Sequence, residues 1–240
     1  MKIFLAGQSS YIDLDWSKCK YNLESFYYFK SSQKKFLKKW DMFFLDSGAF
    51  TFMQKCKDNI DWLSYIEKYI DFIIENDINY FFELDIDCIV GYEKVKEYRE
   101  IIERKTGKKC IPVWHKSRGL EEYIKLCENY DYIAIGGIAN KEIKRNDYPV
   151  FKELLRIAHK RKCKVHGLGF TNTKELCKYK FDSVDSTTWN RGRFGDLYYF
   201  ENGTMRIYKP KNSRLKNGKE ANAFCLKEWV KFQQYADKKL

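Results

Sequence analysis

The segment CIPVWHKSRGLEEYIKLCENYDYIAIGG, residues 110–137, contains a complete β–α–β pattern. Two short β-rich runs, 110–115 and 132–137, flank a stretch over 120–130 whose apolar residues recur with helical spacing. A strand, a helix and a second strand in this order predict two parallel strands joined by a helix. The segment therefore indicates an α/β protein with a parallel sheet.

The same alternation extends in both directions along the chain. Further strands are predicted at 2–7, 42–46, 79–85, 164–169 and 182–186, and further helices around 60–73, 95–107, 150–160 and 173–178. About seven apolar strands, with no glycine-rich phosphate loop after the first, favour an abbreviated (β/α)8 barrel of the TIM type. An open doubly wound sheet is the alternative.

The pattern changes after Asp196. Residues 197–208 predict a hairpin with its tight turn at Asn202-Gly203, and a basic, turn-rich loop follows over 209–219. From residue 220 the chain has the pattern of a closing amphipathic helix. Because no linker divides the chain, we expect one domain over 1–240, with a barrel core at 1–195 and these additions at 196–240.

Charge and cysteine usage limit the class of protein. The 240-residue chain has a formal net charge of +12, which favours an anionic partner such as nucleic acid, although genome-driven lysine enrichment is an alternative. Its eight cysteines include no C-x-x-C pair, so a structural zinc site is not indicated, and free cysteines suit the cytoplasm. No run is long enough for a signal peptide or a membrane span, so we expect no membrane partner.

Polar residues follow the predicted strands at their carboxyl ends. These residues are Asp46, Asp85, His115, Gly136, Gly137 and Asp185. In a parallel barrel such ends meet at one mouth, although each aspartate alone could be only a helix N-cap. His166 is interpreted as a core histidine and His159 as a solvated one. Neighbouring carboxylates separate their pKa values into an acid and a base, and carboxylates without cysteine or histidine partners disfavour zinc and leave magnesium as the possible metal.

Several of these segments together resemble the tRNA-guanine transglycosylase family. LDSGAF at 45–50 is similar to the family's Asp-Ser-Gly-Gly-Phe/Tyr segment, with Ala49 in place of the second glycine. DIDC at 85–88 is loosely similar to its Asp-Glu-Cys segment, and GGIA at 136–139 to its Gly-Gly-Leu-Ala. KVHGLGF at 164–170 and SVDSTTWNRGRFG at 183–195 repeat the order of a Gly-x-Gly strand and the nucleophilic aspartate. The resemblance covers roughly residues 43–195 and implies a (β/α)8 barrel that exchanges guanine for a 7-deazaguanine base.

The sequence also departs from this family. It lacks the C-terminal Cys-x-Cys-x-x-Cys plus histidine zinc site that helps the family hold tRNA, and it is much shorter than a bacterial tRNA enzyme. The compact form resembles the phage and bacterial branch that inserts 7-deazaguanine derivatives, such as preQ0, into DNA. The resemblance therefore implies DNA and a free 7-deazaguanine base as substrates, with tRNA as the alternative.

The resemblance also implies roles for individual residues. Asp185 takes the place of the nucleophile, Asp46 that of the general acid and base, and Asp85 that of the residue that recognises guanine. His115 takes the place of a base-contacting glutamine, Ser47 and Phe50 belong to the substrate-binding segment, and the two glycines supply backbone N–H groups. A covalent sugar–carboxylate intermediate requires neither a metal nor a cofactor.

The nucleic acid itself would be bound by basic side chains near the nucleophile. The expected phosphate contacts are Arg191, Arg193, Lys209, Lys211 and Arg214, although the basic loop could be only a solvated turn. Three other functions remain open: a tRNA transglycosylase, a base-releasing N-glycosylase or nucleoside hydrolase, and a non-catalytic nucleic-acid-binding subunit.

Overall fold

Seven strands of the protein form one curled parallel sheet with helices around its outside. The computed structural model describes residues 1–48, 51–52, 60–170, 172–209 and 218–240. The strands of the large sheet are β1 (Lys2–Ala6), β2 (Tyr21–Ser25), β3 (Met42–Asp46), β4 (Val113–Trp114), β5 (Tyr132–Ile135), β6 (Lys164–Gly167) and β7 (Ser183–Ser186). Their order is β3-β2-β1-β7-β6-β5-β4, and every neighbouring pair is parallel.

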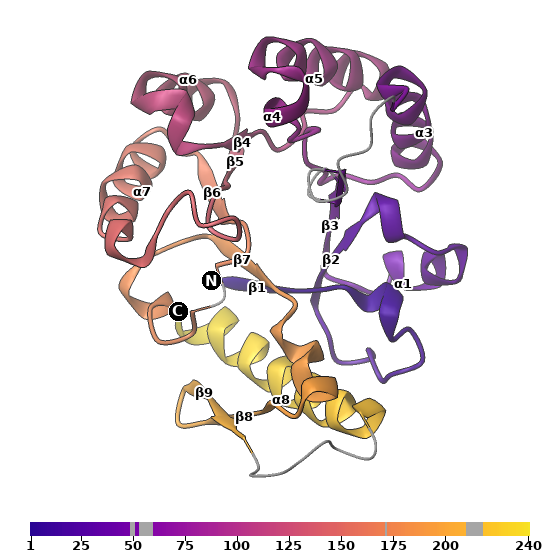
Figure 1. Cartoon of the computed structure of the whole chain (residues 1–240), viewed down its shortest axis with the longest axis vertical. Helices are drawn as coiled ribbons and strands as arrows, with labels where there is room; N and C mark the ends of the chain where they lie inside the picture. The colour runs from indigo at the N-terminus through magenta and orange to yellow at the C-terminus, as the bar shows by residue number, and fades with distance from the viewer. Residues whose placement is uncertain (49–50, 53–59, 171, 210–217) are drawn as a thin grey trace.

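The helices lie around the outside of this sheet (Figure 1). They are α1 (Lys34–Leu37), α3 (Trp62–Glu75), α4 (Asp87–Val90), α5 (Tyr92–Thr106), α6 (Gly119–Asn129), α7 (Val150–Lys160) and α8 (Gly218–Lys239). Short 3-10 turns occur at Gln8–Ser10, Phe26–Tyr28, Ser31–Gln33, Lys116–Arg118, Arg145–Asp147, Leu176–Lys178 and Thr188–Phe194. The predicted mixed α/β organisation with a parallel sheet is confirmed.

Alternating side chains divide the apolar core into two layers. Phe4 and Ala6 of β1 belong to a small cluster enclosed by the strands, which also contains Phe44 and Phe82. Their neighbours in β1, such as Ile3, belong to the larger cluster between strands and helices. Because successive residues of a strand point to opposite faces, β1, β3, β4 and β5 each contribute apolar side chains to both layers. Burial on both faces explains why these strands read as apolar runs.

A short segment connects the two edge strands of the sheet. The Phe82 N–H donates to the Leu45 carbonyl of β3 at 2.9 Å, and the Ile111 N–H, just before β4, donates to the Phe81 carbonyl at 2.8 Å. The strand predicted over 79–85 is therefore only a two-residue bridge. Its continuation is interrupted because the Glu83 side chain, and not a backbone carbonyl, accepts the Val113 N–H at 2.9 Å.

Two further predictions of secondary structure were wrong. Strand β2 was missed because its alternate residues Asn22 and Glu24 are polar, yet both are buried, and the Asn22 amide donates to the Leu5 carbonyl at 2.7 Å. The helix predicted over 173–178 is only a 3-10 turn at Leu176–Lys178. The chain leaves the turn there because Tyr179 and Phe181 enter the core.

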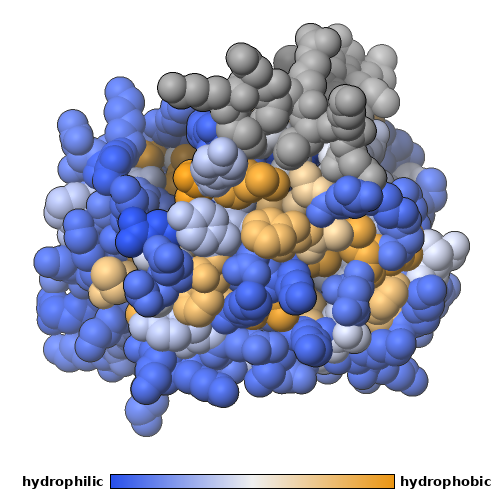
Figure 2. All heavy atoms as spheres, turned by 90° about the horizontal axis from the view of Figure 1, so that it is seen from below, coloured by the Kyte–Doolittle hydropathy of each residue, from blue (hydrophilic) through white to orange (hydrophobic). Residues whose placement is uncertain are grey.

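The C-terminal part lies against one side of the sheet. Strands β8 (Leu197–Glu201) and β9 (Thr204–Tyr208) pair antiparallel, and α8 packs against β1, β8 and the Thr188–Phe194 turn. Figure 2 views the molecule from this end and shows hydrophobic side chains gathered in the middle of a hydrophilic surface. None of the helices in the described ranges combines the length and the apolar composition of a membrane span.

Candidate active site

The carboxyl ends of the strands surround a cavity of about 470 Å³. Its wall includes five carboxylic residues and one histidine: Glu24, Asp46, Glu83, Asp85, His115 and Asp185. The chain as a whole carries a net charge of +12, so this acidic wall contrasts with the remainder of the molecule. A wall of this kind suits a ligand that offers several hydrogen-bond donors.

Asp46 is the last residue of β3, and its side chain faces the cavity. One oxygen accepts the Gly48 N–H at 3.0 Å. Burial, followed by the nearby charges of Asp185 and Asp85, raises the pKa of Asp46 from its ordinary 3.8 to about 6, against the effect of the Gly48 bond. A carboxyl group with such a pKa can both donate and accept a proton near neutral pH.

Asp185 lies in β7 and is held through one of its two oxygens. Oδ1 accepts the Gly169 N–H at 2.6 Å and lies 3.3 Å from Nε2 of His166. Within the described part of the chain, no hydrogen bond reaches Oδ2. The carboxylate is therefore oriented at one oxygen while the other is available to a ligand in the cavity.

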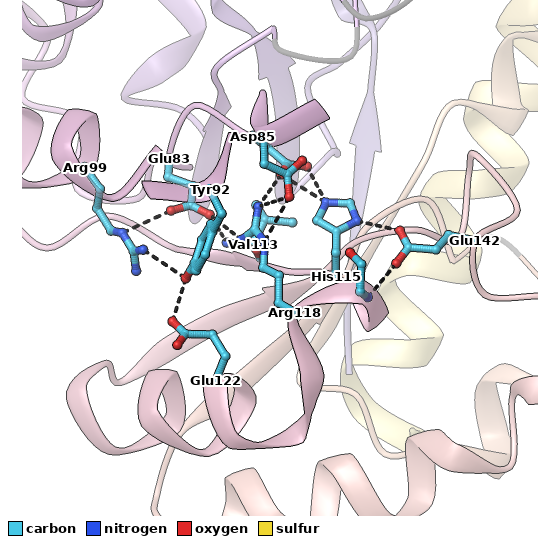
Figure 3. A network of polar contacts seen from close by, with 11 residues as sticks. Glu83, Asp85, Tyr92, Arg99, Val113, His115, Arg118, Glu122 and Glu142 are labelled. Atoms are coloured by element: carbon cyan, nitrogen blue, oxygen red, sulfur yellow. Dashed lines mark hydrogen bonds and ion pairs between the residues drawn. The ribbon is translucent and has the colours of Figure 1, made fainter. Parts of the chain in front are cut away.

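His115 follows directly after β4, and its ring lies between two carboxylates (Figure 3). Nε2 lies 2.8 Å from Asp85, and Nδ1 lies 2.8 Å from Glu142. Burial alone would lower the pKa of His115, but the hydrogen bonds and charges of the two carboxylates outweigh it and raise the pKa to about 9. Because both ring nitrogens are engaged, the predicted contact of His115 with a base is not supported; the side chain instead orients Asp85.

A group of largely buried ion pairs lies beside this histidine, on the side away from Glu142 (Figure 3). Arg118 contacts Glu83 at 3.2 Å, Asp85 at 3.2 Å and Asp87 at 2.9 Å, and its guanidinium lies 4.1 Å from the centre of the Tyr92 ring. Glu83 also pairs with Arg99 at 3.1 Å. These contacts connect the segment 83–87 to α5 and to the turn before α6, so Asp85 is held from two sides.

This cluster also contains the only group of metal-ligand type found among the described residues. Donor atoms of Asp85, Asp87 and His115 lie within 4.8 Å of one another. However, the Arg118 guanidinium bridges the two aspartates, and His115 is itself cationic at neutral pH given its raised pKa. Two positive charges already occupy the places where a cation would bind, so the residues present do not suit a metal ion.

The two glycines after β5 have different environments. Gly136 lines the cavity, but its N–H donates to the Trp114 carbonyl at 2.9 Å and is therefore not available as the predicted donor to a ligand. A side chain at this position would also meet His115, because an added Cβ would lie 2.7 Å from the imidazole Cε1. Gly137 has a φ of +80° and lines the cavity, and its N–H remains the candidate donor.

Of the two remaining predicted substrate contacts, one lies away from the cavity and the other lies outside the described residues. Ser47 is buried, its carbonyl accepts the Tyr65 hydroxyl at 2.6 Å, and it does not line the cavity. Phe50 lies outside the described residues. The aromatic residue that does line the cavity with an exposed side chain is Tyr28, which comes from the turn after β2.

The predicted nucleic-acid contacts are partly engaged within the protein. Arg191 pairs with Asp196 at 2.9 Å, and Lys209 lies 3.6 Å from the same carboxylate. Arg193 is exposed and its guanidinium lies over the Phe194 ring at 4.6 Å. Lys211 and Arg214 lie outside the described residues.

Several residues of the site were missed at the level of sequence. Glu24 was missed because it lies in β2, a strand that was not predicted. Its carboxylate accepts the Ser9 N–H at 2.7 Å and a side-chain N–H of Gln33 at 3.0 Å. Glu83 stands two residues before Asp85, a spacing that places both on one side of an extended segment and could have signalled its role. Arg118 and Glu142 carried no local signal, because the side chains that they contact lie about 30 residues away.

Neither a protein-family model nor a curated protein sequence matches this chain.

Proposed function

We propose that this protein is an enzyme that exchanges guanine in DNA for a 7-deazaguanine base through a covalent Asp185–sugar intermediate. The observation that carries the proposal is the pair formed by Asp185 and Asp46. Both line one cavity; Asp185 has one oriented and one available oxygen, and the pKa of Asp46 is raised to about 6. A nucleophile and an acid–base group are the two elements that retaining exchange at a glycosidic carbon requires.

The fold supports this proposal. The bridge at Phe81–Phe82 joins β3 to the segment before β4, and all neighbouring strands of the seven-stranded sheet are parallel. We interpret this arrangement as an abbreviated (β/α)8 barrel with the cavity at the carboxyl ends of its strands, where enzymes of this architecture bind their substrates. The resemblance of segments within 43–195 to the tRNA-guanine transglycosylases supports the same assignment.

In the first step the guanine nucleotide leaves the base stack and enters the cavity. Oδ2 of Asp185 attacks C1′ as the bond between C1′ and N9 of guanine breaks. Protonated Asp46 gives its proton to the departing guanine. The products are a sugar–Asp185 ester, free guanine and the Asp46 carboxylate.

In the second step a 7-deazaguanine base replaces the guanine in the cavity. The Asp46 carboxylate removes the N9 proton of the new base, and N9 attacks C1′ as the bond to Asp185 breaks. Both carboxyl groups return to their starting states, so no metal or redox cofactor takes part. Access of water must be restricted during the exchange, since water would otherwise hydrolyse the ester.

Recognition of the base falls to the donors and acceptors of the cavity wall. Asp85 can accept hydrogen bonds from N1–H and the exocyclic amine of guanine while His115 and Arg118 hold its orientation. The N–H of Gly137 is the candidate donor to O6. For phosphates, Arg193 is exposed and forms no ion pair within the described part of the chain.

The test measures release of labelled guanine from duplex DNA and, separately, from tRNA, with preQ0 present. The wild type is compared with Asp185→Asn, which keeps the size of the side chain, and with Asp182→Asn as a matched control. Asp182 lies three residues earlier and pairs with His159 at 3.0 Å, outside the cavity. We expect release and equal preQ0 uptake in DNA for the wild type and the control, and neither for Asp185→Asn.

Other results have defined meanings. Base exchange in tRNA but not in DNA would show that tRNA is the substrate. Release of guanine without uptake of preQ0 would indicate a glycosylase. No release from either nucleic acid, with binding unchanged in Asp185→Asn, would replace the proposal by a nucleic-acid-binding function.

A further inference from the structure

A chain of buried hydrogen bonds leads from Asp185 through the interior of the strand-enclosed core. Nε2 of His166 lies 3.3 Å from Asp185 Oδ1, and Nδ1 lies 2.5 Å from the Ser183 hydroxyl. The Ser183 hydroxyl lies 2.6 Å from the hydroxyl of Tyr132. His166 and Ser183 are fully buried, and Tyr132 is nearly so.

The imidazole of His166 is confined by aromatic rings. The rings of Phe4, Phe44 and Phe82 have their centres 5.9, 5.2 and 5.5 Å from that of His166. The histidine is therefore a core residue, as the sequence predicted. Close packing restricts rotation of the ring and leaves its two nitrogens pointing along the hydrogen-bond chain.

The direction of the hydrogen bonds in this chain follows from counting the donors and acceptors of its members. If Tyr132 donates to Ser183 and Ser183 donates to Nδ1, then Nε2 carries the imidazole proton and donates to Asp185. In the reverse direction the Tyr132 hydroxyl would have no acceptor among the described residues, and the lone pair of Nε2 would face a carboxylate oxygen. Only the first direction satisfies every buried group.

We propose that the Tyr132–Ser183–His166 chain positions Asp185 for attack by presenting an N–H to Oδ1. This inference rests on the nucleophilic role proposed for Asp185. Together with the Gly169 N–H, His166 holds Oδ1 on one side and leaves Oδ2 to form the bond to C1′. When the base bond forms in the second step, negative charge returns to the carboxylate, and both N–H groups stabilise it on Oδ1.

Tyr132→Phe tests this role without altering the contacts of Asp185 itself. The substitution keeps the ring and removes the hydroxyl at the far end of the chain. We expect kcat for base exchange to fall about tenfold with KM unchanged, by analogy with the loss that follows removal of an outer hydrogen-bond partner from a metal-binding side chain. The matched control is Tyr123→Phe, which removes a buried hydroxyl donating to the Leu154 carbonyl at 2.9 Å and should leave kcat unchanged.

Nitrogen NMR of the histidine side chains shows, without any substrate, which ring nitrogen of His166 carries the proton. The chain contains three histidines, so His166 can be assigned by comparison with His166→Phe. We expect the wild-type spectrum to show a proton on Nε2 and none on Nδ1, with the Nδ1 signal moved by Tyr132→Phe and the Nε2 signal moved by Asp185→Asn.

Each outcome decides the proposal. A proton on Nδ1 of His166, or unchanged kcat in Tyr132→Phe, would overturn it, as would an equal loss in Tyr123→Phe. If the wild type exchanges no base, the proposed function fails by its own assay, and the nitrogen spectrum still shows whether His166 donates to Asp185.

Discussion

Arg118 is the residue whose removal should damage the site most through electrostatics. Its side chain is 3% exposed, and its guanidinium contacts Glu83, Asp85 and Asp87. Arg118→Met keeps the apolar stem of the side chain and removes the charge. Among the described residues, Glu83, which is completely buried, would then retain only Arg99 as a cationic partner.

The expected cost follows from the burial of these charges. Removing one partner of a buried, hydrogen-bonded ion pair costs about 3–5 kcal/mol, because a charge is left without compensation in a medium that solvates it poorly. We therefore expect the free energy of unfolding to fall by about 4 kcal/mol in Arg118→Met. Arg156→Met is the control: Arg156 also contacts a carboxylate, Glu153 at 2.6 Å, but is 64% exposed. Loss of an exposed pair costs at most about 1 kcal/mol.

Urea unfolding at pH 7, followed by tryptophan fluorescence, measures both variants. A double variant, Glu83→Gln with Arg118→Met, should lose less than the sum of the single changes, since it removes the uncompensated charge together with its partner. A loss below about 1 kcal/mol in Arg118→Met, or one equal to that of Arg156→Met, would refute the reasoning.

Three further predictions concern the same cavity. The pKa of Asp46 is raised from 3.8 to about 6, so its ionisation lowers the stability of the folded protein as the pH rises through this interval. Asp46→Asn should be about 3 kcal/mol more stable than the wild type at pH 7.5, and the difference should vanish as the pH falls below 3.8, as measured by unfolding at both pH values. The pKa of His115 is raised from 6.5 to about 9, so its protonation stabilises the fold fully below pH 6.5 and this stabilisation is lost as the pH rises through 9. The free energy of unfolding should therefore fall by about 3 kcal/mol between pH 6.5 and 9.5 in the wild type, and this fall should be absent in His115→Asn. Gly136→Ala should cost about 1–3 kcal/mol in urea unfolding because the new methyl group would displace the imidazole of His115, and a cost near zero would show that the imidazole moves freely.

The order of strands and helices was accessible from the sequence because it depends on local periodicity. Helix α7 was predicted over 150–160 and lies at Val150–Lys160, since its apolar residues recur every three to four positions. Strand β2 was not predicted, because Asn22 and Glu24 break the apolar run and find their hydrogen-bond partners in other segments. Burial of polar groups in a strand depends on those distant partners.

The sequence by itself determined that Asp46, Asp85 and Asp185 meet at one edge. This follows from parallel strands, whose carboxyl ends lie on the same side of the sheet whatever the side chains are. Only the tertiary structure decided how each of these carboxylates is held. Gly169 and His166 bind one oxygen of Asp185, His115 and Arg118 orient Asp85, and the N–H of Gly136 is taken by the sheet. These contacts depend on distances of a few ångströms between segments far apart in the chain, and local sequence patterns do not determine those distances.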